Sequence, residues 1–477
     1  MMQSEVLIQT PWPIQSYFPS NLDYYESEHH EFLSSINSTP ENSLISSEAY
    51  LPVLSDECVD FDSQNIMVLD EVCQWLCDED QGIEEIQSET SVKGEDVWSP
   101  CLSMEELNDV VMEPESQTGL QNLLKAYGEA IAMGQKELAD VIVRCISEKT
   151  NPVGPAVERI AFNLFQDEDN QGNEYLKQEA IRNFMQAFSA FYRIFPYGQF
   201  AHSTANSAIL EVIPIHAKSV HIFDFDICEG SQWAVVIEAI AQQRKSLTIT
   251  SVKLEEHDSR FEETKRNLFN YAQTFGLNLK VQEKDVTQMV QEMEGRRREG
   301  REFLVFNCMV GLPHMGKTGK TTEVTNFLSI AKAALATNDG IITFGDGESH
   351  ERMEKASDFS SFFDGKLAHY KAIYESMEWG FPSHLTEARM AMETLFVTPF
   401  ISSNSWLQKW MEGRENMVSK NIIGLKGRPM STESLNEARE LVKQAESPYG
   451  IRVEGDSWNE MVLEWNGTPL VKVSVWV

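Results

Sequence analysis

Apolar residues along the chain follow two different periods, and the period changes near residue 219. Upstream of that point, apolar positions recur every seven residues from Leu124 to Cys145, which predicts a helix with one apolar face. The stripe covers only about three heptads, so burial in a core is favoured over a long coiled coil. Further helical patterns occur at 155–166, 174–192 and 201–213.

Downstream of residue 219, short apolar runs alternate with helical patterns. This arrangement is typical of β-α-β units and predicts an α/β fold with a parallel, doubly wound sheet. The tail returns to short alternating runs, which predict antiparallel strands that close the sheet. The expected strands are 219–225, 246–252, 277–281, 303–309 and 340–344, followed by 451–454, 460–465 and 469–476; the expected helices are 233–243, 260–275, 321–336 and 359–379.

Acidic residues are concentrated at the start of the chain. Residues 1–118 hold 26 of the 74 acidic residues but one of the 39 basic residues, so they carry −25 of the formal net charge of −35. Such a composition buries too little apolar surface to offset the entropy of ordering, so we expect a disordered acidic arm.

One stretch of the arm surrounds an apolar helical face with acidic residues. This pattern is typical of segments that fold into a partner's groove, including activation segments, although a merely solvated acidic tail has a similar composition. The apolar face consists of Leu69, Val72, Trp75 and Leu76.

Cysteine usage and hydropathy restrict the class of protein. Seven cysteines are too few, and odd in number, for a disulfide framework, and no zinc-ligand spacing is convincing, so we expect no metal site. The start of the chain lacks the basic and apolar regions of a signal peptide. No apolar run approaches the roughly 18–20 residues that span a bilayer. These features favour a cytosolic or nuclear protein that does not bind membranes.

Two strings offer candidate ligand chemistry. Gly311–Thr318 spells the GxxxxGK[ST] pattern of phosphate-binding loops between an expected strand and helix, which leaves a P-loop-like NTPase as an alternative. Against it, several strands precede the loop, and Pro313 has no N–H to offer a phosphate. The second string places Asp224 and Asp226 at the end of a strand, where doubly wound sheets bind nucleotides or S-adenosylmethionine.

A methyltransferase-like cofactor loop would need several glycines for close backbone approach, whereas this loop has Gly230 alone. We therefore expect Asp224 and Asp226 to cap the following helix or to hold the loop by hydrogen bonds. No set of residues stands out as catalytic. The dense basic run Arg296, Arg297 and Arg298 leaves direct sequence-specific DNA binding as a further alternative, although a solvated turn is its ordinary role.

Several short motifs, taken in chain order, form a known pattern. A leucine-rich stretch at 119–146 precedes Glu158-Arg159-Ile-Ala-Phe and a Phe-Pro-Tyr-Gly-Gln-Phe-Ala-His string. Leu312-Pro313-His314 and two terminal tryptophans, Trp465 and Trp476, follow later. Between them, Val220, His221, Ile222, Phe223 and Asp224 match the signature Val-His-Ile-Ile-Asp with one replacement.

On these motifs, residues 119–477 resemble the plant GRAS family of transcriptional regulators. The resemblance implies a methyltransferase-like Rossmann core with an N-terminal helical cap, without enzymatic activity or a cofactor. The Phe-Asp-Phe-Asp variant is similar to the nodulation-signalling and mycorrhizal subgroup, which implies a role in root symbiosis or hormone signalling. The implied regions are the cap with the first leucine-rich region at 119–215, the VHIID region at 219–245, the second leucine-rich region at 260–300, a PFYRE-like region at 303–400 and the SAW region at 401–477.

The resemblance also implies how such a chain acts. It would work in the nucleus, with the cytoplasm as a second compartment, as a co-regulator that contacts promoter DNA indirectly. Its partners would be other GRAS proteins, in homo- or heterodimers, and DNA-binding transcription factors, with no small-molecule substrate. The leucine-rich positions expected to dock the partner are Leu120, Leu124, Ile131 and Leu138.

Overall fold

The computed structural model describes residues 113–166, 184–253, 260–295, 302–313, 321–348, 356–381, 383–415, 425–443 and 446–477. The predicted activation segment, the basic run 296–298 and the second half of the phosphate-loop string therefore lie outside the described residues. Among the described helices, none combines the length and the apolar character needed to cross a membrane.

One sheet of eight strands forms the centre of the fold, in the order β3-β2-β1-β4-β5-β8-β7-β6. The first five strands along the chain are parallel, and β8, β7 and β6 extend the sheet with antiparallel pairing, as predicted. Because the chain runs outward in both directions from the β1–β4 pair, the topological switch point lies between these strands. The strands are β1 Ser219–Asp224, β2 Ser246–Val252, β3 Leu279–Lys284, β4 Glu302–Val310, β5 Gly340–Asp346, β6 Tyr449–Glu454, β7 Glu460–Trp465 and β8 Thr468–Trp476.

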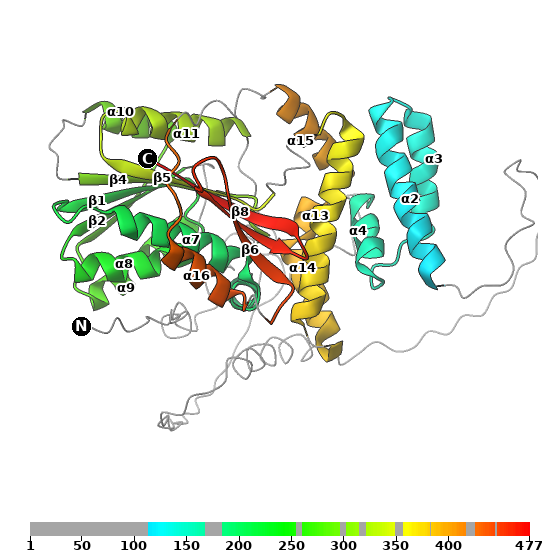
Figure 1. Cartoon of the computed structure of the whole chain (residues 1–477), viewed down its shortest axis with the longest axis horizontal. Coiled ribbons are helices and arrows are strands. Elements are labelled where there is room, and N and C mark those ends of the chain that lie inside the picture. The colour runs from blue at the N-terminus through cyan, green and yellow to red at the C-terminus, as the bar shows by residue number, and fades with distance from the viewer. Residues whose placement is uncertain are drawn as a thin grey trace, which may run out of the picture. The chain divides into compact units, whose positions relative to one another are not determined.

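Helices cover both faces of the sheet (Figure 1). One face packs against α10 and α11, where Phe223, Phe306 and Phe327 form part of a continuous apolar core. The other face carries α7, α8, α9 and α16, with α7 crossing the middle strands. These helices are α7 Pro196–Val212, α8 Ala234–Gln242, α9 Arg260–Thr274, α10 Val286–Gly295, α11 Thr321–Leu335 and α16 Thr432–Leu441.

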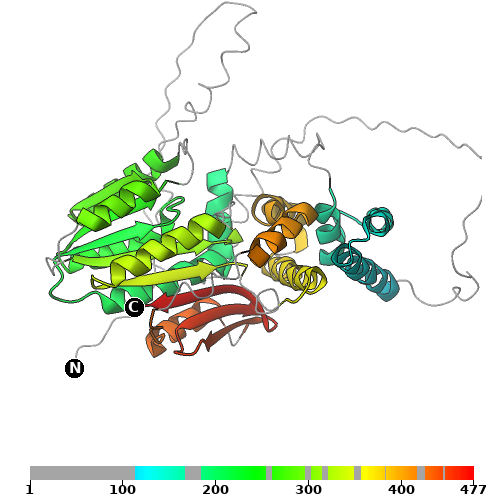
Figure 2. The ribbon, with the colours of Figure 1, turned by 90° about the horizontal axis from the view of Figure 1, so that it is seen from above.

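A group of helices beside the sheet forms the cap, and α13 lies between the sheet and the α2–α3 hairpin (Figures 1 and 2). The hairpin turns at Gly134, whose positive φ of 70° suits glycine. It packs on α13 through Tyr127 and Gly128, and a Cβ at Gly128 would lie 3.2 Å from the Phe363 ring. The cap helices are α2 Glu113–Ala132, α3 Lys136–Ser147, α4 Ala156–Leu164, α6 Phe184–Ile194, α13 Phe359–Gly380, α14 Thr386–Phe396 and α15 Ser403–Glu415.

Two differences from the sequence-based expectation concern helix boundaries. The first helix begins at Glu113, inside the segment expected to be disordered. The average composition of residues 1–118 does not reveal this short helical start. The helix expected at 201–213 begins at Pro196, where proline at the first helical position costs no hydrogen bond. The parallel α/β sheet and its closing antiparallel strands are confirmed.

Buried ion pairs connect the cap helices to one another and to the sheet. Glu348, just after β5, accepts hydrogen bonds from Lys409 Nζ at 2.7 Å and Tyr370 Oη at 2.6 Å, and pairs with the buried Lys366 at 2.9 Å. Burial would raise the pKa of Glu348, but the two lysines lower it overall. This cluster fixes α13 and α15 at the end of β5.

A second ion cluster ties α4 to α13 and α14. The guanidinium of Arg159 donates to Glu393 Oε2 at 3.0 Å, to Glu378 Oε1 at 2.7 Å and to the Gly154 carbonyl at 2.5 Å. Arg159 and Glu393 are both buried, and Arg389 also donates to Glu393 Oε1 at 2.7 Å, so these charges depend on one another for the solvation that water would otherwise provide.

We expect Arg159→Met to lower the free energy of unfolding by about 3 kcal/mol, because the buried Glu393 carboxylate would keep only Arg389 as an ion partner. Urea denaturation followed by circular dichroism measures this change. The matched control is Arg144→Met on the exposed face of α3, for which we expect a change within about 0.5 kcal/mol. Equal effects of the two substitutions would contradict the assigned role of the cluster.

Candidate functional site

Polar side chains meet at the carboxyl ends of β1 and β4, the place where open α/β sheets ordinarily bind ligands. Asp224 ends β1, and Asn307 lies directly opposite it on β4. Gln232 and Trp233 reach the same point from the short helix η2 Ser231–Trp233 that follows the β1 loop. All four residues are buried.

These side chains bind one another in a closed hydrogen-bond network. The Asp224 carboxylate accepts from Trp233 Nε1 at 2.6 Å and from Asn307 Nδ2 at 2.9 Å. The amides of Asn307 and Gln232 pair in both directions, at 3.0 and 3.1 Å. Thr343 on β5 donates to Asn307 Oδ1 at 2.8 Å. The network therefore links three strands to η2.

Asn206 extends this network to α7. Its Nδ2 donates to the Gln232 carbonyl at 2.7 Å, and its Oδ1 accepts from Gln232 Nε2 at 3.3 Å. The polar groups that a ligand would use at the switch point are thus bound by the protein's own side chains, and the fully buried Trp233 indole lies among them.

Burial raises the pKa of Asp224 to about 7, although the hydrogen bonds from Asn307 and Trp233 lower it in part. A carboxylate in this position is therefore more easily protonated in the folded protein than in the unfolded chain.

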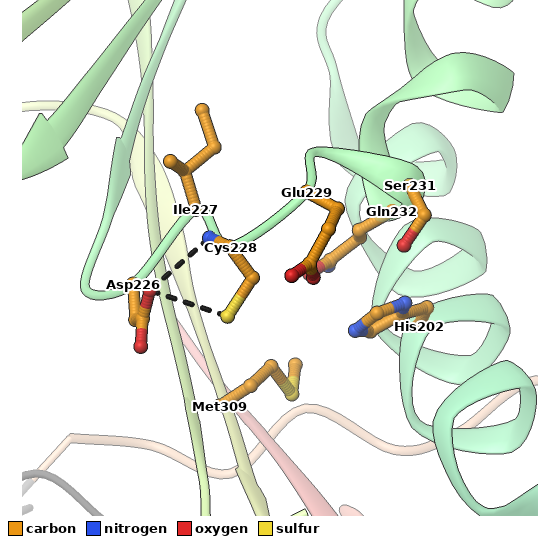
Figure 3. Close-up of a pocket in the computed structure, with 8 residues that line it drawn as sticks. All are labelled: His202, Asp226, Ile227, Cys228, Glu229, Ser231, Gln232 and Met309. Atoms are coloured by element: carbon orange, nitrogen blue, oxygen red, sulfur yellow. Dashed lines mark hydrogen bonds between the residues drawn. The ribbon is translucent and has the colours of Figure 1, made fainter. Parts of the chain in front are cut away.

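A small pocket remains beside the network, and Figure 3 shows the residues that line it. Asp226, Cys228 and Glu229 come from the β1 loop, His202 from α7 and Met309 from β4. The volume that the centre of a water molecule can occupy in this cavity is about 10 Å³. Roughly 10–15 Å³ of such volume is needed to hold one water. It is too small for a nucleotide or S-adenosylmethionine.

The pocket side chains have structural partners. Asp226 Oδ1 accepts from the Cys228 N–H at 3.1 Å and Sγ at 3.2 Å, which holds the loop in its turn (Figure 3). His202 Nδ1 lies 2.8 Å from Tyr192 Oη. Among the described residues, no group of three or more His, Cys, Asp and Glu side chains is placed to hold a metal ion.

The expectation that Asp224 or Asp226 caps a helix is wrong, whereas their role in holding the loop is confirmed. No side chain caps η2 or α8, because the residues at their N-cap positions are Gly230 and Trp233, neither of which has a side-chain oxygen to accept the hydrogen bond. Asp224 instead fixes Trp233, nine residues further on.

The remaining signature residues form the interior of β1. Val220, Ile222 and Phe223 are fully buried between the helical layers. His221 is also buried, with Nε2 2.7 Å from Thr250 Oγ1 and Nδ1 3.7 Å from Glu302. The motif thus builds the central strand up to Asp224.

The described half of the phosphate-loop string is packed inside the fold. Leu312 and Pro313 are buried, and the Gly311 carbonyl lies so close to Gly347 that a Cβ there would clash. Asp346, at the end of β5 beside this loop, accepts from the Glu348 N–H at 2.8 Å. This part of the loop has no space to cradle a phosphate.

The four leucine-rich positions fall into two environments. Leu120 and Leu124 are each 1% exposed and belong to the packing between α2 and the other cap helices, so a partner cannot reach them in the folded chain. Ile131 is half-buried, and Leu138 is 48% exposed. Val141, one turn further along α3, is 50% exposed and lies on the same side of the helix as Leu138.

The terminal tryptophans belong to the antiparallel end of the sheet. Trp465 ends β7 and packs edge-on against Tyr449 at 4.8 Å between ring centroids. Trp476 ends β8 opposite Ile342 of β5. Both positions stabilise the strands that close the sheet, and neither reaches the switch point.

Sequence reasoning missed several residues on which the site depends. Asn307 stands 83 positions from Asp224 and 75 from Gln232, and in the cap Arg159 pairs with Glu393 across 234 positions. One signal was present: Asn307 is a polar residue inside an otherwise continuous apolar strand. Such a residue needs a buried partner.

Comparison with known proteins places these features in a family. Residues 120–477 match the GRAS domain family. The chain is 30% identical over 304 residues to Protein NODULATION SIGNALING PATHWAY 2 of Medicago truncatula, a match that spans 61% of this chain and 58% of that protein. It is 29% identical to the protein of the same name from Lotus japonicus, over 75% of each chain.

A solved structure has the same fold. The crystal structure of SCL7 in Oryza sativa aligns with a TM-score of 0.53 and 21% sequence identity, and the alignment covers 75% of this chain and 99% of that chain. The likeness supports the assignment of a Rossmann-like core with a helical cap.

The raised pKa of Asp224 predicts a pH dependence of stability. The native state holds a proton that the unfolded state releases at a pKa near 3.8, so this contribution to stability is present at low pH and is lost as the pH rises to about 7. Asp224→Asn should therefore remove about 2–3 kcal/mol of the decline in unfolding free energy between pH 5 and pH 8. Urea titrations at both pH values measure this, with the exposed Asp140→Asn as control. An unchanged pH profile would show that Asp224 is already ionised in the fold.

Proposed function

This chain belongs to the GRAS domain family, and on that premise we propose that it is a nuclear transcriptional co-regulator that acts by binding other proteins. The family comprises plant transcriptional regulators. Similarity to the two nodulation-signalling proteins supports a role in root symbiosis. Promoter DNA is then reached through DNA-binding transcription factors, in line with the net charge of −35, which repels phosphate.

The α2–α3 hairpin is the observation that carries the proposal. Its buried face includes Leu124 and Ile142, which hold the helices to the cap, while Leu138 and Val141 point outward on α3. Two exposed apolar side chains on one side of a helix, next to the half-buried Cys145, form the kind of strip that a second helix covers. We propose that another GRAS protein docks on this strip.

The closed switch point supports binding over catalysis. Trp233, Asn307 and Gln232 occupy the volume and the hydrogen-bonding groups that a cofactor would require, and the residual pocket holds about one water. A ligand could enter only if the buried network opened, at the cost of unpaired polar groups.

We expect Leu138→Asp combined with Val141→Asp to abolish binding of a GRAS partner, because two charges would be placed in the apolar contact. Co-purification with a nodulation-signalling relative and light scattering measure binding, and circular dichroism measures folding. Both substituted residues are half-exposed, so the melting temperature should remain unchanged.

The matched controls separate docking from folding. Phe269→Asp on α9 also places a charge at a half-exposed apolar site, yet it should leave partner binding intact. Leu124→Asp should instead unfold the cap, because its side chain is buried. Retained partner binding by the Leu138, Val141 double variant would refute the docking strip.

We further expect ATP, GTP and S-adenosylmethionine to leave the melting temperature of the purified protein unchanged. A ligand at a hundred times its dissociation constant would stabilise the fold by about 2.7 kcal/mol, which a thermal-shift assay detects readily. A saturable upward shift with any of the three would overturn the binding-only function.

A further inference from the structure

Two opposite charges stand beside the apolar strip of α3, two helical turns apart. The strip consists of Leu138, Val141 and Cys145, and the charges belong to Glu137 and Arg144, which are both exposed. Seven residues make almost two full turns of an α-helix, so Glu137 and Arg144 lie only about 20° apart around its axis. They therefore border the same side of the strip, one near each end of it.

The stretch around the strip carries no net charge, although the chain as a whole carries −35. Residues 136–149 hold three acidic and three basic side chains, and all six are exposed: Glu137, Asp140 and Glu148 against Lys136, Arg144 and Lys149. Like charges on two copies of an acidic chain repel each other. A neutral helix is therefore a surface on which a second copy can pack without that repulsion.

A second copy related by a two-fold axis would bring the opposite charges together. Glu137 stands four residues before Val141, and Arg144 stands three residues after it. If two α3 helices pack antiparallel with the axis at Val141, Glu137 comes level with Arg144 of the second copy. Because a two-fold contact is self-complementary, the same pair then forms a second time. Parallel packing would instead place each charge level with its own counterpart, so the charges favour the antiparallel arrangement.

The same arrangement covers the apolar strip with itself. Val141 meets Val141 of the second copy at the axis, and Leu138 comes level with Cys145 of the second copy. Leu138 is 48% exposed and Val141 is 50% exposed in the single chain, so both would lose contact with water. Removing apolar surface from water stabilises association.

The remaining acid on this side of α3 also has a favourable position. Glu148, at the end of the helix, comes level with the start of α3 in the second copy. That start has no side-chain cap on its backbone N–H groups, and Lys136 is its first helical residue. A carboxylate is stabilised near the amino-terminal end of a helix, so Glu148 does not oppose the contact.

We propose that the α3 strip binds a second copy of this chain, through an antiparallel two-fold α3–α3 contact that contains two Glu137–Arg144 ion pairs. The proposal deepens the proposed function and rests on it, because it names the partner that docks on the strip. A helix of 12 residues offers less contact area than the roughly 800 Å² per partner of a standard interface. We therefore expect a weak dimer, with a dissociation constant on the order of 10 μM.

Charge reversal in separate copies tests the proposal on the full chain. Glu137→Arg would face Arg144 twice in a homodimer, and Arg144→Glu would face Glu137 twice. We therefore expect each variant alone to self-associate at least about tenfold more weakly than the wild type. In an equimolar mixture the two substituted side chains face each other and the other pair is unaltered, so the mixture should associate as tightly as the wild type.

Sedimentation velocity between about 1 and 100 μM measures self-association, in about 150 mM salt, where charges more than about 8 Å apart are largely screened. Lys125→Glu and Glu263→Arg are the matched controls. Both reverse an exposed charge away from the strip: Lys125 interacts electrostatically with Asp364 of α13, and Glu263 lies on α9. We expect the wild-type affinity for each control. Circular dichroism should show the wild-type melting temperature for all four variants.

The mixture decides between a specific two-fold contact and a general effect of charge. A single variant that self-associates as tightly as the wild type would overturn the proposal. So would a mixture that associates no more tightly than the single variants do.

Co-purification with a nodulation-signalling relative, measured on the same samples, distinguishes this proposal from the proposed function. If the wild-type chain binds the relative through the strip but stays monomeric at 100 μM, the protein-binding function stands and the homotypic contact is wrong. If the Leu138, Val141 double variant still binds the relative, the docking strip itself is wrong, and the homotypic contact fails with it.

Discussion

The hydrogen-bond network around Asp224 is the constraint on which the rest of the fold depends. It joins the end of β1 to β4 and β5 through Asn307 and Thr343, and to η2 through Trp233. Buried polar groups are costly when unpaired and specify a unique arrangement when fully paired, so this network fixes the register of the central strands and closes the ligand edge at the same time. The same hydrogen bonds therefore order the central strands and pair the polar groups at the carboxyl edge.

In the cap, the stabilising contacts converge on the helix α13. This helix meets the α2–α3 hairpin through Phe363, binds β8 through His369, whose Nδ1 lies 3.2 Å from the Pro469 carbonyl, and carries Lys366 to Glu348. The Arg159 cluster adds α4 and α14 to the same helix. Because so many contacts converge on one element, the hairpin buries one face against the cap while Leu138 and Val141 on the other face of α3 stay exposed.

The sequence predicted the centre of the sheet well because β1 and β4 are buried on both faces and therefore read as nearly continuous apolar runs, whereas the edge strand β3 is mostly half-buried. It did not predict α10, a short helix with a polar surface, nor which leucines face outward. A heptad stripe records apolar positions without distinguishing Leu124, which packs in the cap, from Leu138, which is half-exposed. The partners of Asp224 were also out of reach, since Asn307 lies 83 residues away and pairs with it only through strand order.

The two edges of the sheet differ in which side chains they bury and which they leave exposed. At the carboxyl edge, side chains that could hold a ligand bind each other, and Trp233 is completely buried. At the amino edge, the buried ion Lys245 and a strained backbone at Trp458 support apolar side chains that remain outside. Folding alone would favour glycine instead of Trp458, where φ is positive, and an uncharged side chain instead of the buried Lys245. The carboxyl edge thus has the physical character of a core rather than of an open ligand cleft.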